Sequence, residues 1–351
     1  YIMAYTTIDK NSDHFNTILR TGNYAGSGTT AITGVGFSPG LMWEKKRNGT
    51  SIHALLDAVR GNGKQLQSET TGAETTTSQY ATIDSDGFTV NNSGDYGSSS
   101  DLVSWHWKAG TTGSGTTTGT GTGKAYSYSV NTTAGFSIVK YVGNGNAGQQ
   151  IPHHLGAVPH FILLKPMDRT DNWRVYHHKQ HDSSPANYQL KLNSTNARDS
   201  GSDVWNDTIP TSTYFTLGSN AGVCANDENF IAYCFTEKVG YSKFGSYVGN
   251  GNASGTFVYT GFKPQFIIQK PLSTTQNWQL HDTKRPGYNV KNYNISPNNT
   301  NAEADNEFID ILSNGFKNRT SGVLNVSTNT HVYIAFGQSI VGSNNVPCTA
   351  R

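Results

Sequence analysis

The 351-residue chain has little charge and few of the residues that favour helices. Charged residues make up 14% of the chain, and the formal net charge is +2 at pH 7, with acids and bases spread along the sequence. No basic run or basic helix is present to grip phosphates, so we do not expect nucleic acid as a partner. Helix formers are sparse, and residues 53–60 (HALLDAVR) are the only stretch that resembles a helix.

Long apolar runs and a regular cysteine framework are also lacking. No run approaches the roughly 18 consecutive apolar residues of a membrane-spanning helix, so membrane insertion is not expected. The three cysteines, Cys224, Cys234 and Cys348, have no regular spacing. We expect free buried thiols, although a Cys224–Cys234 bridge stays open.

What the chain does contain is Thr, Ser, Gly and Asn together with 11% aromatic residues. This composition is typical of short strands joined by tight turns, and it predicts an all-β protein. The chain is longer than a usual single domain, so two or three modules are expected.

A turn of the form Gly-x-x-Pro that leads into a strand ending in Lys occurs three times. Its prolines are Pro39, Pro159 and Pro264, which lie 120 and 105 residues apart (159 − 39 and 264 − 159). The longer first interval contains the run GTTGSGTTTGTGTGK at residues 110–124, whose composition indicates a flexible linker or a surface insertion. A repeat of this kind predicts tandem copies of one structural unit.

Other landmarks recur in the same order around each proline. A Gly-Asn turn precedes it, and an aromatic-rich strand closes each copy, at residues 102–108, 230–235 and 332–336. We therefore predict tandem antiparallel β-sandwich modules, jelly-roll-like, each with its own core and arranged like beads in a row. The predicted boundaries are a closing strand of a preceding repeat at 1–12, repeats at 13–110, 130–240 and 242–340, a Gly/Thr-rich linker or insertion at 111–129, and a C-terminal tail at 341–351. Residues 1–5 are alternatively a strand that completes a sandwich from outside its own repeat.

One pair of charged residues recurs at fixed distance from the anchor proline. Asp57 with Arg60 and Asp282 with Arg285 lie 18 and 21 residues after their prolines, where the second copy has His177 and Gln180. An Asp-x-x-Arg segment closes a turn through a charge-assisted hydrogen bond. We predict exposed structural ion pairs without a catalytic role, because no second acid recurs beside them as paired-carboxylate hydrolysis requires.

A tryptophan recurs 14 residues after the second and third prolines. Trp173 is followed by Tyr176, and Trp278 is followed by His281. An exposed indole beside amide and imidazole groups suits sugar binding, so these four residues are candidate ligand-binding residues. The alternative is a core or inter-module tryptophan whose N–H group has a partner.

Motifs for metal, cofactor or enzyme chemistry are not recognisable. The second copy is rich in histidine, but His177 and His178 alternate to opposite faces of a strand, and no Cys or Glu accompanies them at zinc-site spacing. We therefore expect no metal and no cofactor. No Ser-His-Asp order or Gly-x-Ser-x-Gly turn is present, so the chain is not expected to be an enzyme.

The anchor segments resemble a known group of proteins. The segments AGFSIVKYVGN at 134–144 and HLGAVPHFILLK at 154–165, with their counterparts at 36–39, 53–61, 86–88 and 105–108, resemble the repeated β-sandwich modules of structural and tail-fibre proteins of marine tailed phages such as cyanophages. Those modules are relatives of the concanavalin A-like lectin/glucanase fold. The resemblance covers almost the whole chain, although the second copy departs from the pattern after Lys165.

The resemblance implies a virion structural protein on the outside of the particle, a fibre or decoration component that adheres to host-surface glycans. The alternative is a purely architectural subunit, and a less favoured one is a glycan-cleaving enzyme with two acids facing each other across a sheet. Expected partners are other virion proteins, host glycans and further copies of the chain. A homotrimer is expected, because tailed-phage fibres commonly form parallel trimers and such trimers cover exposed sheet edges.

Overall fold

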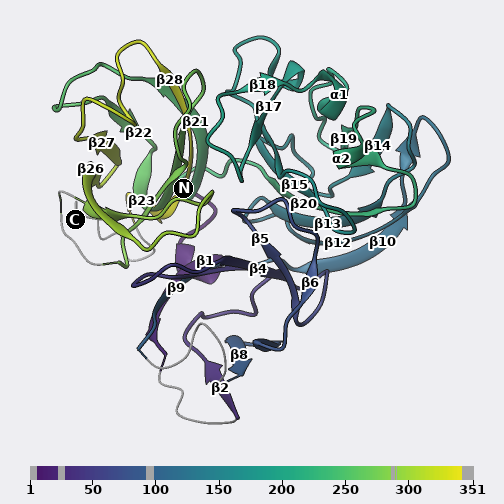
Figure 1. Cartoon of the computed structure of the whole chain (residues 1–351), viewed down its shortest axis with the longest axis horizontal. Helices are drawn as coiled ribbons and strands as arrows, with labels where there is room; N and C mark the ends of the chain where they lie inside the picture. Colours follow the sequence, from purple (N-terminus) through teal and green to yellow (C-terminus); the bar gives the residue numbers. More distant parts are fainter. Residues whose placement is uncertain (1–5, 23–27, 92–98, 286–288, 290, 342–351) are drawn as a thin grey trace, which may run out of the picture.

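The computed structural model describes residues 6–22, 28–91, 99–285, 289 and 291–341. The chain is nearly all β, in antiparallel sheets that form three lobes around a common centre (Figure 1). This confirms the predicted all-β class of sandwich-like modules. In each lobe an inner sheet faces an outer sheet, and the inner sheet is the larger one in the first two repeats.

Repeat 1 has a six-stranded inner sheet of order β1-β9-β3-β4-β5-β6 and an outer sheet of order β2-β8-β7. A short 3-10 helix, η1 (Asn11–Asp13), precedes it. The strands are β1 (Phe15–Thr21), β2 (Thr29–Ile32), β3 (Leu41–Lys46), β4 (His53–Asp57), β5 (Lys64–Gln67), β6 (Thr75–Thr76), β7 (Tyr80–Asp84), β8 (Gly87–Asn91) and β9 (Asp101–Trp107).

Repeat 2 has an eight-stranded inner sheet of order β10-β12-β13-β20-β15-β16-β17-β18 and an outer sheet of order β11-β14-β19. Its elements are β10 (Thr111–Thr116), β11 (Thr118–Gly119), β12 (Ala125–Asn131), β13 (Phe136–Val142), β14 (Gln149–Pro152), β15 (Phe161–Pro166), β16 (Arg174–His177), η2 (Pro185–Asn187), β17 (Tyr188–Lys191), β18 (Asp199–Ser200), α1 (Ser202–Trp205), β19 (Tyr214–Thr216), α2 (Ala221–Cys224) and β20 (Asn229–Phe235).

Repeat 3 has two four-stranded sheets, β21-β28-β23-β24 inside and β22-β27-β26-β25 outside. The strands are β21 (Ser242–Val248), β22 (Phe257–Tyr259), β23 (Phe262–Pro271), β24 (Gln279–Asp282), β25 (Lys291–Asn294), β26 (Ala304–Leu312), β27 (Gly315–Asn318) and β28 (Thr330–Ser339).

The pairing registers show that the three repeats are built alike. The residue two positions after each anchor proline pairs with an aromatic residue of the closing strand: Leu41 with Trp107, Phe161 with Phe235 and Phe266 with Phe336. Pro39 and Pro159 lie just ahead of β3 and β15, as predicted. Pro264 instead lies inside β23, at a bulge between Pro264 and Phe266, a position that tolerates a residue without an N–H group.

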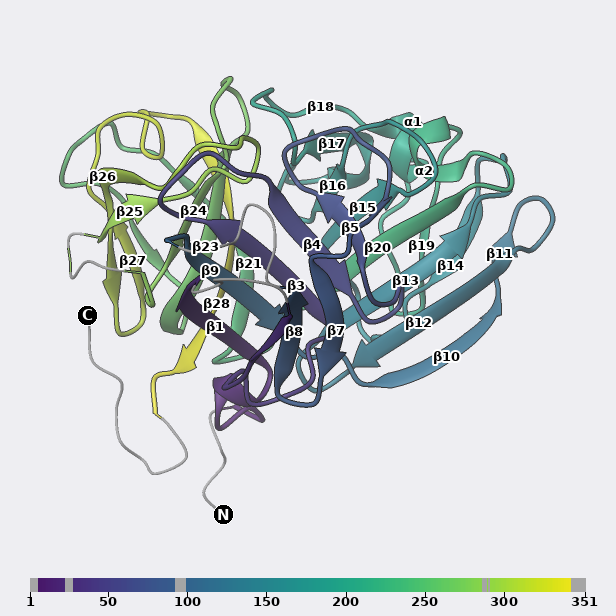
Figure 2. The same ribbon diagram turned by 60° about the horizontal axis from the view of Figure 1, so that its bottom comes forward.

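Of the two alternatives for residues 111–129, a linker or an insertion, the structure shows an insertion. β10 and β12 pair with each other, and β12 pairs along most of β13, so the insertion widens the inner sheet of repeat 2 (Figure 2). The rings of Tyr126 and Tyr128 lie over Gly115 and Gly113 of the neighbouring strand, where a Cβ atom would collide with them. The glycines therefore serve close packing here.

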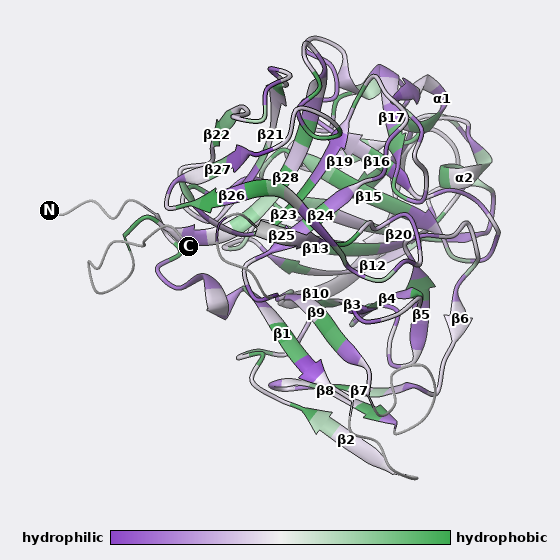
Figure 3. Cartoon of the chain, turned by 60° about the vertical axis from the view of Figure 1, so that its left-hand side comes forward, coloured by the Kyte–Doolittle hydropathy of each residue, from purple (hydrophilic) through white to green (hydrophobic). Residues whose placement is uncertain are grey.

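The predicted row of separate beads is also wrong. Each repeat keeps a small core of its own between its two sheets, for example around Phe88 in repeat 1 and Phe316 in repeat 3. The opposite faces of the three inner sheets meet in one shared central core, which contains buried residues of all three repeats. Hydrophobic stretches accordingly lie on the central strands β9 and β28 (Figure 3). Both faces of each inner sheet are thus buried near the centre.

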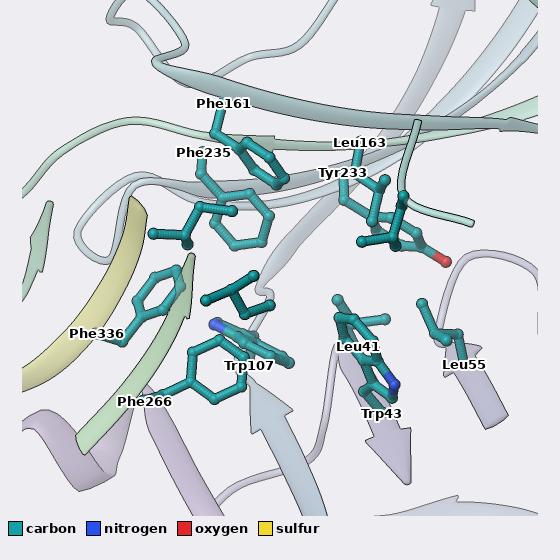
Figure 4. Close-up of a pocket in the computed structure, with 13 residues that line it drawn as sticks. Leu41, Trp43, Leu55, Trp107, Phe161, Leu163, Tyr233, Phe235, Phe266 and Phe336 are labelled. Carbon is teal, nitrogen blue, oxygen red and sulfur yellow. The ribbon is translucent and has the colours of Figure 1, made fainter. Parts of the chain in front are cut away.

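The middle of the shared core holds a cavity of about 30 Å³. Side chains from all three repeats line it, including Trp107, Phe235 and Phe336 (Figure 4). Its lining is apolar, and a site of this size without polar partners does not stabilise a bound water. The cavity is a packing feature of the centre.

The ends of the chain lie largely outside the described residues. The described part of the predicted strand at 1–12 is not a strand: Thr6 donates a hydrogen bond to Val239, and Ile8 is buried in the central core. Residues 1–5, the tail from 342 onward and Cys348 lie outside the description. Cys224 and Cys234 are free and buried, which confirms the expected thiols. None of the described helices is long and apolar enough to span a membrane.

Candidate functional site at the repeat junctions

The three repeats are joined by one contact that is used three times in a closed ring. The lysine that ends each anchor strand reaches a threonine carbonyl of another repeat: Lys45 Nζ to Thr300 O at 3.2 Å, Lys165 Nζ to Thr71 O at 3.1 Å and Lys270 Nζ to Thr195 O at 2.7 Å. Repeat 1 thus contacts repeat 3, repeat 2 contacts repeat 1, and repeat 3 contacts repeat 2. We name the junctions 1–2, 2–3 and 3–1 after the repeats that they join.

Backbone hydrogen bonds reinforce each junction. The same threonine carbonyl accepts an amide at 2.9 Å, from Ser51, Asp171 and Gln276 in turn. Burial lowers the pKa of each of Lys45, Lys165 and Lys270 to about 8, so these lysines are partly desolvated at their carbonyl partners. The ring is therefore built from buried polar groups that have partners.

The predicted Asp-x-x-Arg pairs exist, but the prediction that they are exposed is wrong. Both side chains of each pair are 0% exposed. Asp57 accepts from the amides of Val59 and Arg60 at 2.9 and 2.8 Å, and also from Arg60 Nε. Asp282 repeats this arrangement with Arg285, whose Nε lies 2.5 Å from Asp282 Oδ2. Each pair closes the turn after an inner-sheet strand, as the spacing predicts.

A second acid and a neighbouring repeat complete each of these two clusters. At junction 1–2, Arg60 Nη1 contacts Glu74 at 3.2 Å, and Tyr233 of repeat 2 donates to Asp57 at 2.8 Å. At junction 3–1, Arg285 and Arg47 both pair with Glu303, at 3.5 and 2.8 Å. There Trp105 Nε1 of repeat 1 donates to Asp282 at 3.3 Å. Charged side chains thus seal two of the three junctions.

Junction 2–3 has a different set of residues at the same three positions. His177 replaces the aspartate, Gln180 replaces the arginine, and Arg198 replaces the glutamate. The equivalence of Arg198 with Glu74 and Glu303 follows from the backbone, because each of these amides bonds a carbonyl of the neighbouring repeat at 2.8–2.9 Å. His177 keeps the turn-closing role through its Nδ1, which accepts from the Lys179 amide at 3.1 Å. The sealing ion pair is lost.

A polar cleft of about 370 Å³ lies at this junction. Its lining contains cationic, acidic and hydroxyl-bearing side chains from repeats 2 and 3: Lys179, Gln180, His181, Asp182, Arg198, Leu272, Ser273, Thr328 and Thr330. Clefts of this size are suited to small ligands or parts of larger ones. Arg198 reaches across to donate to the carbonyl oxygen of Gln180.

An aromatic ring supports the cationic wall of the cleft. The guanidinium carbon of Arg198 lies 4.4 Å from the ring centroid of Tyr188, and His181 stacks on the same ring with centroids 4.7 Å apart. Tyr188 is half-buried between them. Such stacking holds a guanidinium in one orientation while leaving its N–H groups available.

The four predicted ligand-binding residues do not form a surface. Trp173, Tyr176, Trp278 and His281 are each 0–1% exposed. Trp173 Nε1 donates to the Gln67 carbonyl at 2.8 Å, and Trp278 Nε1 donates to the Lys191 carbonyl at 3.0 Å, each in the neighbouring repeat. The indoles are thus inter-module residues with satisfied N–H groups, which is the alternative that the sequence left open. A sugar cannot stack on them in this structure.

The histidines of repeat 2 take part in packing and local hydrogen bonds. Burial lowers the pKa of His177 to about 3 and the pKa values of His153 and His178 to about 4. His154 stacks on Tyr128 with ring centroids 3.7 Å apart. Within the described ranges, no group of three or more His, Cys, Asp or Glu side chains could hold a metal ion.

Sequence reasoning missed the residues of the cleft, although a signal for them exists. The segments TTGAE at 70–74, STNAR at 194–198 and NTNAE at 299–303 share a Thr-x-Ala core that ends in Glu, Arg and Glu. Their threonines are the three carbonyl acceptors of the ring. Aligning these segments would have singled out Arg198 as the exception.

Comparison with known proteins gives one family. The profile of DUF7483, described as a domain of unknown function, matches residues 10–339. No curated protein matches the sequence. The matched region runs through all three repeats, as expected if the closed ring is the unit that the family shares. The chain belongs to the DUF7483 family.

Proposed function

We propose that the chain is a non-enzymatic component of a virus particle, a fibre or decoration protein that contacts host-surface glycans through the cleft at junction 2–3. The observation that carries the adhesive part is the difference between the junctions. Two are closed by buried ion clusters, whereas the third opens into a cleft with a stacked arginine and several hydroxyl groups. Guanidinium, amide and hydroxyl groups are the donors and acceptors that sugar hydroxyls require.

The resemblance of the anchor segments to phage structural modules supports the virion part of the proposal. The architecture is compatible with it, because three sandwiches that share one core form a stiff body able to carry a binding surface on a particle.

The acids of the described chain support a binding role over glycan cleavage. Asp182 is the single carboxylate among the residues that line the cleft, and hydrolysis by paired carboxylates needs two. Asp57 and Asp282 are fully buried and hydrogen-bonded to arginine, so they are out of reach of a substrate.

Self-association is the second candidate role, and one surface favours it. The inner and outer sheets of repeat 3 end in β21 and β22, which expose Val248, Phe257 and Tyr259 at 55%, 46% and 52%. In repeat 2 the edge strand equivalent to β21 is β13, which β12 covers. We propose that a second copy of the chain covers the open edge of repeat 3, within the expected trimer.

Three experiments test these roles. Antibody labelling of intact particles against the chain is expected to decorate their surface, and labelling of disrupted particles alone would contradict an exposed position. Glycan-array binding by the purified chain is expected for the adhesive role, and a silent array would leave the architectural role. Sedimentation at micromolar concentration is expected to show an oligomer, whereas a clean monomer would refute self-association.

A further inference from the structure

We propose that the cleft at junction 2–3 binds the anionic group of an acidic glycan, a carboxylate or a sulfate. This inference rests on the proposed function, because it names the class of glycan that the adhesive site takes. Its first support is the charge of the cleft. Lys179 and Arg198 carry positive charge, and His181 adds an imidazole ring. Asp182 is the one acid of the lining.

The two cations of the cleft are not neutralised by acids of the described residues, although Arg198 donates one hydrogen bond to the Gln180 carbonyl oxygen. The ion pairs of the surrounding part of repeat 2 involve Arg174 and Lys191. Neither Lys179 nor Arg198 pairs with a carboxylate of any residue that the structure describes. Arg198 has further guanidinium N–H groups besides the one bonded to Gln180. A guanidinium held against a ring binds a carboxylate or sulfate through two parallel hydrogen bonds.

An unmet hydrogen-bonding group beside the cleft is a second, independent observation. Gln180 is 0% exposed and lines the cleft. Its Nε2 donates to the carbonyl oxygens of Pro185 and Tyr188 at 2.8 and 2.7 Å, which fixes the amide, whereas its Oε1 is buried without a partner among the described residues. A buried acceptor of this kind is costly unless a donor reaches it, and a sugar hydroxyl is such a donor.

At the other two junctions, the protein itself supplies the negative charge that balances the arginine of the cluster. At the position of Arg198 they carry Glu74 and Glu303, each of which pairs with the arginine of its own cluster. Junction 2–3 places a cation where these junctions place an anion. The missing negative charge is the one that an acidic ligand would supply.

The test is a titration of the full chain with three hexasaccharides, in which calorimetry measures the binding. One is a galacturonic acid oligomer, one is a sulfated galactose oligomer, and one is a neutral galactose oligomer. The variants are Arg198→Glu, which restores the residue type of the other junctions, and Lys179→Ala, which alters an exposed side chain. Arg169→Ala is the matched control, because Arg169 is a half-exposed cation of the same repeat that does not line the cleft.

We expect at least one acidic oligomer to bind, with at least about tenfold weaker binding by Arg198→Glu, several-fold weaker binding by Lys179→Ala, and unchanged binding by Arg169→Ala. Thermal unfolding of each variant shows whether it is folded. Equal binding of the neutral oligomer would overturn the acidic preference and leave glycan adhesion standing. Acidic binding that survives both Lys179→Ala and a folded Arg198→Glu would overturn the site. Absence of binding to all three oligomers and to a glycan array would overturn adhesion itself.

Discussion

Asp57 accepts four hydrogen bonds inside the protein. Two come from the turn amides of residues 59 and 60, one from the Arg60 guanidinium and one from the Tyr233 hydroxyl. Removing the carboxylate leaves a fully buried guanidinium with only the partly exposed Glu74 to balance it. A buried ion pair adds little net stability to a protein. Deleting one partner is strongly destabilising, because the other charge is then buried without compensation.

Asp57→Ala is therefore expected to destabilise the chain by roughly 3–5 kcal/mol. The control is Asp13→Ala, because Asp13 pairs with Lys10 at 2.7 Å while both side chains are more than half exposed. Exposed pairs are worth at most about 1 kcal/mol. Urea unfolding midpoints compare the two variants with the parent chain. Similar small shifts for both would show that the Asp57 cluster is not a buried structural element.

Four buried histidines and one partly buried histidine make the stability of the chain sensitive to mild acid. Burial lowers the pKa values of His53, His106 and His177 to about 3, and those of His153 and His178 to about 4. Between these values and 6.5 the unfolded chain binds protons that the folded chain does not. Stability is therefore fully present above about pH 6.5 and falls as the pH is lowered.

Lowering the pH from neutral to 5.5 is expected to reduce the free energy of unfolding by roughly 1.4 kcal/mol for each fully buried histidine. Thermal unfolding at pH 7.5 and 5.5 measures the effect, with His106→Phe as the matched variant, because His106 lies among apolar neighbours beside Phe88. The variant should lose less stability on acidification than the parent. An unfolding temperature that is unchanged or higher at pH 5.5 would contradict the burial of these imidazoles.

At the scale of elements, the hairpin of β10 and β12 is ordered by aromatic packing. Tyr126 and Tyr128 stack near each other, and His154 lies on the ring of Tyr128. We expect slow hydrogen exchange for the amides of β12, which are bonded on both sides. Tyr128→Ala should accelerate this exchange by about an order of magnitude or more, whereas Tyr259→Ala, at an exposed site on β22, should not. Rapid exchange in the parent chain would indicate the flexible linker that composition alone suggests.

The elements also show how far the sequence could lead. Strands form at the three predicted anchor segments and at the three predicted closing segments, because the signals for them are local. The helix-like residues 53–60 instead begin with β4, whose position between β3 and β5 overrides local propensity. The anchor strands LMWEK, FILLK and FIIQK do not alternate, which is typical of strands buried on both faces and was the available signal for the shared core.

The sequence could not show whether the tryptophans of the predicted ligand-binding site are exposed or buried. An indole with a polar neighbourhood looks the same in sequence whether it meets a sugar or a neighbouring repeat. Trp173 and Trp278 meet neighbouring carbonyls that are far away in the sequence. Asp57 is buried by Tyr233, which lies 176 residues further along the chain. Such contacts depend on the ring, and the spacing within one repeat does not report them.

At the scale of the whole molecule, no repeat covers its own apolar surface. Repeat 2 presents Phe136, Ile138, Phe161 and Leu163 to the shared core, where the other two repeats bury them. An isolated fragment of residues 130–240 would expose this face. We expect the fragment to bind a hydrophobic dye strongly and to unfold at lower urea concentration than the full chain. A fragment as stable as the full chain would show that the modules are independent.

The closed ring is tested most directly by scanning calorimetry of the full chain. A shared core and three reciprocal junctions couple the repeats, so unfolding one removes the partners of the other two. We predict a single transition whose calorimetric and van't Hoff enthalpies agree. Two or three resolved transitions, each with the enthalpy expected for about a hundred residues, would contradict the ring and restore the picture of independent modules.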